Sequence, residues 1–337
     1  MKVLVTGASG FVGSYLCRYL VKQGVQVRAL KRKTSNLSLL GDAVDEIEWV
    51  EGDILEVDSL NEAMKDIEKV YHSAAVVSYN KKSEKALYKV NVEGTANVVN
   101  LCLDNNISKL LHVSSVAALG KAKPNTLLTE EETWEDSSTN SPYGFSKYLA
   151  EMEVWRGMAE GLSAVIINPS FVLGAGKWSD SSVKVFQRIY EGLSFYPKGS
   201  NGYVDVRDVA KVAIQIMESD ISRQRFIVSA ENLSYLEVFS QMALAMNKKP
   251  PSIALNGPLM YFGMIADQIK SLFTGSEPVI NIPTIKLTQR KFDYSNEKLL
   301  DTIDYQFEQI ENTIKETAAK MMEAKSVGKD FAILDLK

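Results

Sequence analysis

The stretch that decides the fold is KVLVTGASGFVG, residues 2–13. A strand-forming run passes directly into a glycine loop, and a helical pattern follows. Gly7 permits a tight turn, Gly10 lets the backbone approach a pyrophosphate, and Gly13 allows close packing of helix on sheet. A helix N-terminus offers such an anion N–H donors and partial positive charge. Glycines also serve ordinary turns, but this order favours a dinucleotide site. We expect its contacts to be Gly7, Ser9, Gly10, Phe11, Val12 and Gly13.

The alternation that begins here continues through the first two thirds of the chain. Short β-branched runs alternate with segments of helical period, which is typical of parallel strands joined by crossover helices. The sequence therefore predicts an α/β fold with a doubly wound parallel sheet of the Rossmann type. The expected strands are 2–5, 25–30, 48–50, 70–72, 109–113, 164–168 and 225–229, and the main expected helices are 10–23, 90–105 and 143–161.

The pattern loses its regularity after Pro169, where glycine-rich connections at 174–176 and 199–202 alternate with short helices. We expect residues 1–169, with about 203–230, to form the cofactor-binding domain. A smaller, mostly helical substrate lobe is expected from about 170–202 and 231–325, with a tail at 326–337. Ligands of such sheets bind beyond the carboxyl ends of the strands, so a lobe there would roof a substrate cleft.

Composition narrows the classes of partner. The 337 residues carry a net charge of -4 with mixed signs, which gives no basic surface for a nucleic acid. We therefore expect small-molecule partners. The broken apolar stretch 253–273 predicts no membrane span. Two cysteines in apolar helical patterns and an N-terminus without signal-peptide features favour the cytoplasm. His72 and His112 lack carboxylates at metal-ligand spacing, so no metal site is expected.

The end of the second expected strand indicates which dinucleotide is used. It reads RALKRK, residues 28–33, without the carboxylate that would hold a ribose 2′-hydroxyl. A planar guanidinium suits a 2′-phosphate, so we predict NADP(H) rather than NAD(H). Arg32 is the main expected contact, assisted by Lys31 or Lys33. The alternative is a solvated basic turn.

Other strand ends extend the expected cofactor site. Asp53, followed by Ile54, is placed to contact the adenine edge, although it could equally cap the next helix, for which Asp58 and Ser59 are nearer. Ala74 and Ala75 are small residues where a cofactor must pass close to the backbone.

A second motif, SPYGFSK at residues 141–147, opens the helix 143–161 and places Tyr143 and Lys147 on one face. The ammonium would favour the phenolate and lower the pKa of Tyr143, as a general acid or base requires. A surface helix pair is the plain alternative. Ser115 ends the preceding strand, where its hydroxyl could bind the substrate oxygen. Ser114 would be held by the cofactor or by backbone.

Taken together, these motifs resemble the extended short-chain dehydrogenase/reductase family, also called the NAD-dependent epimerase/dehydratase family. The resemblance covers about residues 1–235 and includes Asn91, the serine pair, NPS at 168–170 and YVDVRDVA at 203–210. It implies a catalytic set of Ser115, Tyr143, Lys147 and Asn91. It also implies that Lys147 bonds the nicotinamide ribose and that Asn168, Pro169 and Ser170 lie near the nicotinamide, with Ser114 and Tyr143 also contacting the cofactor.

Within that family, VRALKR at residues 27–32 is similar to the dihydroflavonol reductase and cinnamoyl-CoA reductase branch, and NPS also suits the hydroxysteroid dehydrogenases. The resemblance implies reversible reduction of a ketone or aldehyde, and family members are often homodimers through a helix like 143–161. The chain departs from the family at Gly174-Ala175, where Gly-Pro is usual, and after Tyr294, where the usual ending is missing. Both departures fall in the substrate half.

Three functions therefore compete. The first is a carbonyl reductase. Apolar residues of the expected lobe suggest that its substrate is lipophilic or aromatic, although the same residues could form the core of the lobe. These residues are Leu255, Pro258, Leu259, Tyr261, Phe262, Met264, Ile265 and Phe273. A nucleotide-sugar epimerase or dehydratase would need groups for a diphosphate, and the candidates are Arg188, Arg223 and Arg290. A redox-sensing binding protein would not need Ser115, Tyr143 and Lys147.

Overall fold

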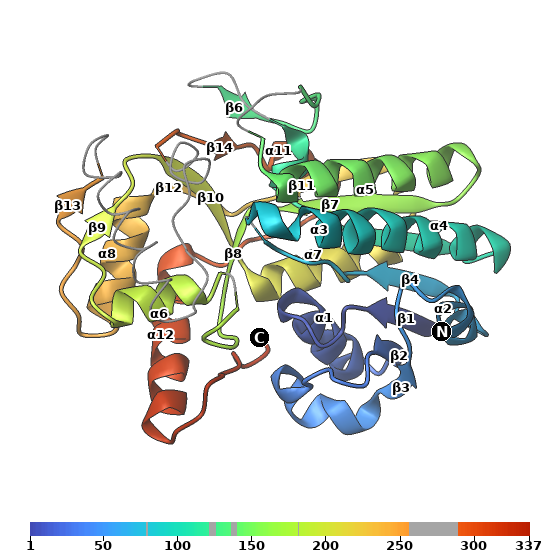
Figure 1. Ribbon diagram of the computed structural model, residues 1–337, viewed down its shortest axis with the longest axis horizontal. Helices are drawn as coiled ribbons and strands as arrows, with labels where there is room; N and C mark the ends of the chain where they lie inside the picture. Colours follow the sequence, from blue (N-terminus) through green and yellow to red (C-terminus); the bar gives the residue numbers. More distant parts are fainter. Residues whose placement is uncertain (79, 121–125, 136–139, 181, 256–288) are drawn as a thin grey trace.

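The computed structural model describes residues 1–78, 80–120, 126–135, 140–180, 182–255 and 289–337 (Figure 1). Its centre is a seven-stranded sheet in which all neighbouring strands are parallel, in the order β3-β2-β1-β4-β5-β7-β11. The strands are β1 Lys2–Thr6, β2 Gln26–Lys31, β3 Glu48–Glu51, β4 Lys69–His72, β5 Lys109–Val113, β7 Ala164–Pro169 and β11 Gln224–Val228. The seven predicted strands and the doubly wound fold are confirmed.

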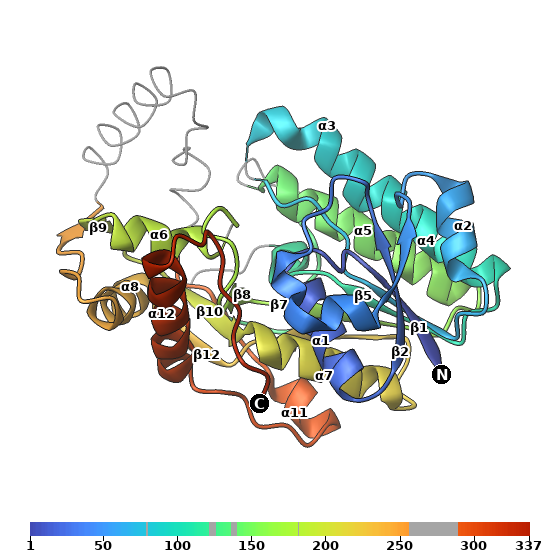
Figure 2. The same cartoon turned by 90° about the horizontal axis from the view of Figure 1, so that it is seen from below.

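Helices cover both faces of this sheet (Figures 1 and 2). Alternate residues of a strand point to opposite faces, so Val3 and Val5 pack in the core with one helix layer while Leu4 packs with the other. The first layer contains α1 Phe11–Lys22 and α7 Val206–Glu218. The second contains α2 Val57–Met64, α4 Gly94–Asp104 and α5 Pro142–Ala159. Burial on both faces explains the continuous apolar strands.

The helix predicted at 90–105 is longer and irregular. It begins with α3 Glu84–Leu87, passes through a π-helical turn, η3 Tyr88–Glu93, and continues as α4. Such turns insert one extra residue and often occur at functional sites. Sequence periodicity could not reveal this turn, because the extra residue shifts the apolar pattern out of phase.

The second part of the chain contains a small sheet that was not predicted. It joins β8 Phe171–Leu173, β10 Ser200–Asp205 and β12 Glu231–Ser234. Residues 200–202, predicted as part of a connection, begin the central strand of this sheet. Gly202 lies here because a Cβ atom would stand 2.5 Å from Ser229 Oγ. Close packing, not a turn, therefore requires this glycine.

The remaining helices and strands of the second part of the chain are short, apart from the helices α8 and α12. The helices are α6 Lys184–Tyr190, α8 Tyr235–Ala245, α11 Glu297–Thr302 and α12 Ile310–Ser326. Two further strand pairs are β9 Phe195–Tyr196 with β13 Ile253–Ala254, and β6 Leu127–Leu128 with β14 Asp293–Tyr294.

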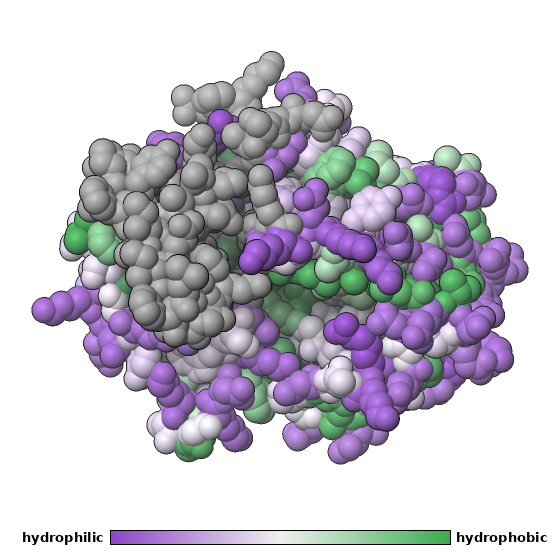
Figure 3. Space-filling view, in the orientation of Figure 1, coloured by the Kyte–Doolittle hydropathy of each residue, from purple (hydrophilic) through white to green (hydrophobic). Residues whose placement is uncertain are grey.

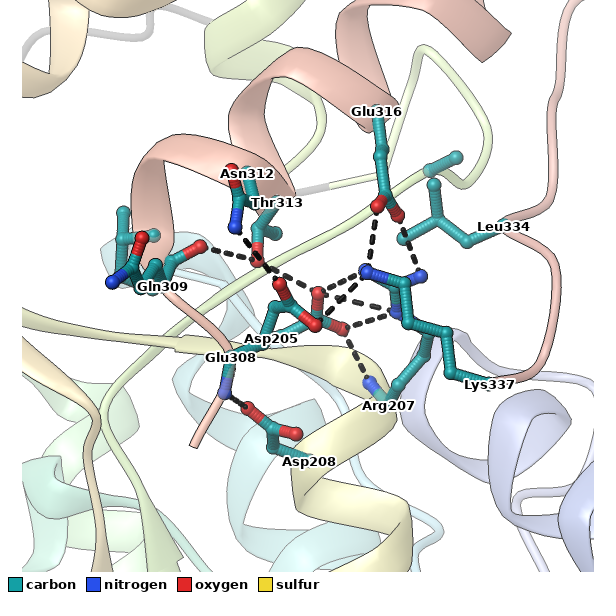
Figure 4. A network of polar contacts seen from close by, with 12 residues as sticks. Asp205, Arg207, Asp208, Glu308, Gln309, Asn312, Thr313, Glu316, Leu334 and Lys337 are labelled. Atoms are coloured by element: carbon teal, nitrogen blue, oxygen red, sulfur yellow. Dashed lines mark hydrogen bonds and ion pairs between the residues drawn. The ribbon is translucent and has the colours of Figure 1, made fainter. Parts of the chain in front are cut away.

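A buried polar network joins α7 to α12 (Figure 4). Asp205 caps α7 by accepting from Arg207 N at 2.7 Å, and it also accepts from Arg207 Nη2 and Thr313 Oγ1, each at 2.7 Å. Arg207 Nη1 reaches Glu316 at 2.7 Å. The side chains of Asp205 and Arg207 are 0% and 2% exposed, so neither charge is stabilised by water. Each buried charge is therefore compensated mainly by the other.

The segment predicted as a tail packs against the first half of the chain. Leu334 is buried, its N–H donates to Tyr15 Oη at 2.8 Å, and its carbonyl accepts from Arg18 at 2.9 Å. Ala332 N donates to Gly176 O at 3.0 Å. These contacts fasten the C-terminus over α1 and beside the loop that follows β8.

Candidate active site

The glycine loop has the geometry that its sequence predicts. Gly7 has a φ of +72°, and a Cβ atom there would lie 2.5 Å from Ala74 N. A Cβ atom on Gly13 would lie 2.2 Å from Gly7 O, so helix and loop meet without room for a side chain. Gly10 is the N-cap of α1, and no side chain of the described residues caps this helix. Its first N–H groups are therefore available to an anion.

One pocket, here called the adenosine-side pocket, extends from this loop over the ends of β2 and β3. Arg32 lies at its edge in a turn closed by its N–H, which donates to Ser35 Oγ at 3.0 Å. Asp53 accepts from Leu55 N at 3.0 Å, whereas the N-cap of α2 is Glu56. Asp58 and Ser59 lie inside α2, so none of the three residues considered caps it. The lining includes Gly7, Ser9, Gly10, Lys31, Arg32, Asp53, Ile54, Ala74 and Ala75.

A second pocket, here called the catalytic pocket, opens on the other side of Gly10. Residues from the glycine loop, from the ends of β5 and β7, and from α5 meet in it. The middle of the face drawn in Figure 3 is hollowed near the first turn of α1, with apolar residues in the hollow. The catalytic pocket is lined by Gly10, Phe11, Val12, Ser73, Ala75, Val77, Val113, Ser114, Ser115, Tyr143, Lys147, Pro169, Ser170, Phe171, Val172 and Ser182.

Tyr143 and Lys147 reach this pocket from the first turns of α5. Ser141 caps the helix by accepting from Gly144 N at 3.0 Å, and Pro142 follows at the first helical position. Lys147 is 2% exposed and donates to Val113 O at 2.9 Å. Burial lowers the pKa of Lys147 from 10.5 to about 8, and the nearby Glu151 opposes that change.

The serine pair at the end of β5 uses its two hydroxyls differently. Ser115 Oγ accepts from Ala117 N at 3.2 Å, while Ser114 Oγ donates to Glu151 Oε1 at 2.5 Å. The partner of Ser114 is therefore a buried carboxylate, not the backbone. Sequence reasoning missed Glu151, although it lies one helical turn beyond Lys147.

The NPS motif divides between the pocket and its support. Pro169 and Ser170 line the catalytic pocket, but Asn168 lies behind it, fully buried, and donates to Ser115 O at 2.9 Å. Ser170 Oγ is buried and has no hydrogen-bond partner among the described residues. An unpaired hydroxyl at a pocket wall is what a polar ligand such as a nicotinamide cofactor would satisfy. The residues present therefore fit that group.

Asn91 lies outside both linings and is 1% exposed, because the π-helical turn aims its side chain at the β4–α3 connection. Its Oδ1 accepts from Val76 N at 2.7 Å, and its Nδ2 donates to Val76 O at 3.0 Å and to Ser146 Oγ at 2.9 Å. The side-chain amide of Asn91 is thus hydrogen-bonded to the backbone of Val76 and to Ser146, which precedes Lys147 in α5. The structure places Asn91 behind the catalytic pocket, and its expected catalytic role stays a prediction.

The arginines considered for a diphosphate do not meet at the catalytic pocket. Arg188 faces Glu191 at 3.9 Å, and the backbone of Arg290 accepts from Ser200 N. Arg223 N donates to Ala164 O, which places it at the amino edge of the sheet, opposite the pocket. Of the apolar set expected around the substrate, Leu255 is half-buried next to β13, and the others lie outside the described residues.

Over the described ranges, no three His, Cys, Asp or Glu side chains are grouped as a metal ion would require. Over the same ranges, no helix has the length and apolar character needed to cross a membrane. Cys17 and Cys102 are buried free thiols.

A glycine loop at the first crossover of a parallel sheet, with serine, tyrosine and lysine at the carboxyl edge, defines an NAD(P)-dependent enzyme of the extended short-chain dehydrogenase/reductase type. The chain belongs to the NAD dependent epimerase/dehydratase family, whose model matches residues 3–228.

Relatives within this family include enzymes named as reductases. The putative dihydroflavonol 4-reductase of Synechocystis is 29% identical over 307 residues, covering 89% of this chain and 88% of that protein. Sterol demethylase protein B of Methylococcus capsulatus is 26% identical over 291 residues, covering 85% and 88%. The crystal structure of gox2253 superposes with a TM-score of 0.81 at 27% identity and covers 96% of this chain and 98% of that one.

Proposed function

We propose that the protein is an NADP(H)-dependent oxidoreductase that reversibly reduces a ketone or aldehyde to an alcohol. The observation that carries this proposal is the catalytic pocket, which joins Ser115, Tyr143 and Lys147 to the glycine loop and to Ser170, whose hydroxyl has no partner in the part of the chain that the structure describes. The printed name of the Synechocystis relative supports the same class of reaction.

The roles proposed for the side chains follow from their contacts. Ser115 accepts from Ala117 N–H, so its own proton can be donated to a carbonyl oxygen in the pocket. Tyr143 is the general acid that protonates this oxygen, and Lys147 is the ammonium that stabilises the resulting phenolate. The bound nicotinamide supplies the hydride in reduction and accepts it in oxidation. The roles of Tyr143 reverse in oxidation.

We place the adenosine and its 2′-phosphate in the adenosine-side pocket, and the nicotinamide in the catalytic pocket near Pro169 and Ser170. Arg32 and Lys31 both line the first pocket, beside the end of β2 where a 2′-phosphate would lie. Asp53 and Ile54 line the part of this pocket in which we place the adenine. Preference for NADP(H) over NAD(H) rests on these charges.

Replacing Arg32 by Glu tests the cofactor preference. A carboxylate repels the 2′-phosphate and can accept from a 2′-hydroxyl, so Arg32→Glu should raise KM for NADPH roughly 10- to 100-fold and lower that for NADH. Initial rates with each cofactor give both values. Lys329→Glu, an exposed charge reversal outside both pocket linings, is the matched control. An unchanged KM for NADPH in Arg32→Glu would refute the assignment.

The alkaline side of the pH profile should report Lys147. The ammonium is the useful form for reduction and its pKa lies at about 8, so kcat/KM should fall as pH rises through about 8. Lys147→Arg, which stays charged, should lose this limb even where its activity is lower. A limb that persists unchanged in Lys147→Arg would show that another group titrates.

We propose that the substrate is lipophilic or aromatic and is enclosed by the lobe of residues 170–202 and 231–325. Aromatic and aliphatic side chains form much of the wall of the catalytic pocket, among them Phe11, Val12, Val77, Phe171 and Val172.

We further propose a cytoplasmic location, where buried thiols stay reduced. We also propose a homodimer through α5, which exposes Phe145 and Met152.

A panel of aromatic aldehydes, lipophilic ketones and keto-steroids, each assayed for NADPH oxidation, tests the proposed function. Turnover of at least one class is expected. No turnover, together with cofactor that stays bound through purification, would instead favour a nucleotide-sugar epimerase or dehydratase, which regenerates its cofactor in each cycle.

A further inference from the structure

Glu151 is a fully buried carboxylate near the middle of α5. It lies on α5 one turn beyond Lys147 and two turns beyond Tyr143, so all three share one face of the helix. A carboxylate in such a place is costly unless charged and hydrogen-bonding partners compensate it. Its partners therefore indicate why the sequence places it there.

Those partners come from three adjacent strands of the large sheet. Ser114 Oγ, at the end of β5, and Asn168 Nδ2, near the end of β7, each donate to Glu151 Oε1 at 2.5 Å. Arg225 Nη1, on β11, lies 3.2 Å from Oε2. One carboxylate thus joins α5 to the ends of β5 and β7, which reach the catalytic pocket, and to the beginning of β11.

Glu151 fixes the hydrogen-bonding direction of Ser114, and the backbone N–H of Ala117 fixes that of Ser115. Because Ser114 gives its single proton to Glu151, its oxygen can only accept on the pocket side. Ser115 accepts from Ala117 N–H and keeps its proton for the pocket. Asn168, held by Glu151, donates its amide to Ser115 O and so fixes the backbone that carries this donor.

Glu151 also opposes the loss of charge on Lys147. Burial lowers the pKa of Lys147, and the carboxylate raises it. Two histidines also lie near Lys147: His112 Nε2 is 3.5 Å from its Nζ, and the ring of His72 lies tilted beside that of His112, with ring centroids 5.1 Å apart. Burial lowers the pKa of His72 to about 3 and that of His112 well below its usual range, so both rings are neutral.

We propose that Glu151 is a positioning residue of this site: its buried carboxylate takes the proton of Ser114, so that Ser114 accepts towards the pocket, it holds Asn168 against the backbone carbonyl of Ser115, and it places a negative charge one helical turn from Lys147. This role rests on the proposed function and deepens it, since it concerns the same pocket. Glu151 itself does not reach the reacting atoms; it acts through the serine pair, Asn168 and Lys147.

The chain contains two histidines, and this allows a test that needs no turnover. In ¹⁵N-histidine-labelled full-length protein, the signal of His112 should shift as Lys147 loses its proton, with a midpoint at about pH 8. His72→Asn assigns the second signal. Glu151→Gln should move the midpoint to lower pH by about one unit or more, because it removes an adjacent negative charge. Glu151→Asp keeps the negative charge and should therefore keep most of the parental midpoint.

The kinetic arm compares Glu151→Gln with Glu153→Gln, on the same helix, where Glu153 pairs with Arg156 at the surface. Glu151→Gln should lower kcat roughly 10- to 100-fold with little change in KM for NADPH, because misdirected serines cost orientation rather than binding. Glu153→Gln should retain the parental kcat. A Glu151→Gln protein with the parental midpoint and kcat would overturn the proposal, whatever its melting temperature.

If Glu151→Gln does not fold, Ser114→Ala probes the same contact by removing one hydroxyl. A tenfold or greater fall in kcat supports the serine orientation, and a parental kcat contradicts it. A parental protein that turns over no carbonyl substrate counts against the proposed function alone, since the histidine titrations of Glu151→Asp and the parental protein still report on Glu151.

Discussion

Replacing Tyr143 by Phe should lower kcat/KM for carbonyl reduction by roughly 10²- to 10⁴-fold, the contribution of a positioned general acid. The substitution removes one oxygen from a residue that lines the catalytic pocket and is 8% exposed. Cofactor affinity should change far less, because the ring and the helix remain. Steady-state rates and cofactor titration of the purified variant measure the two effects separately.

Tyr148 provides the matched control on the same helix. Its ring stacks on Trp134, with centroids 4.8 Å apart, and it lines a different groove. Tyr148→Phe should therefore keep the parental rate. Equal activity of Tyr143→Phe and the parental protein would remove Tyr143 from the mechanism.

The largest expected loss of stability is that of Asp205→Ala. The substitution leaves the guanidinium of Arg207 buried without its main counter-ion and removes the cap of α7 and the acceptor of Thr313 Oγ1 (Figure 4). Breaking one side of a buried pair costs about 3–5 kcal/mol. The free energy of unfolding from denaturant titration should fall by about that amount.

An exposed ion pair on α12 gives the comparison. Lys315 and Glu311 are separated by one turn and are both more than half exposed. Glu311→Gln should change the free energy of unfolding by less than about 1 kcal/mol. If Asp205→Ala cost no more than Glu311→Gln, the network would not be what joins α7 to α12.

The sequence predicted the features that depend on burial pattern or on local spacing. The inner strands of the large sheet are buried on both faces, so their apolar runs stand out, whereas the edge strand β3 is only partly buried. Gly13 is required by its contact with Gly7 in the same loop, while Gly7 is required by its positive φ and by the approach of Ala74 after β4. Tyr143 and Lys147 were predictable because helical spacing places them together.

The sequence did not predict features that depend on contacts between residues far apart in the chain. Gly202 resembles a turn residue, and its reason, the approach of Ser229 and Tyr294, comes from other strands. Glu151 resembles any glutamate on a helix until Ser114 and Asn168 are brought to it by two strand ends. The π-helical turn around Asn91 likewise breaks the period from which helices are predicted.

Transfer of deuterium from NADPH that carries deuterium at both nicotinamide C4 positions to the carbinol carbon of the product tests the central claim most directly. We expect one deuterium in the alcohol formed by the parental protein and almost none with Tyr143→Phe in the same time. An alcohol formed without the label, or label that stays in the cofactor while a sugar nucleotide is converted, would contradict it.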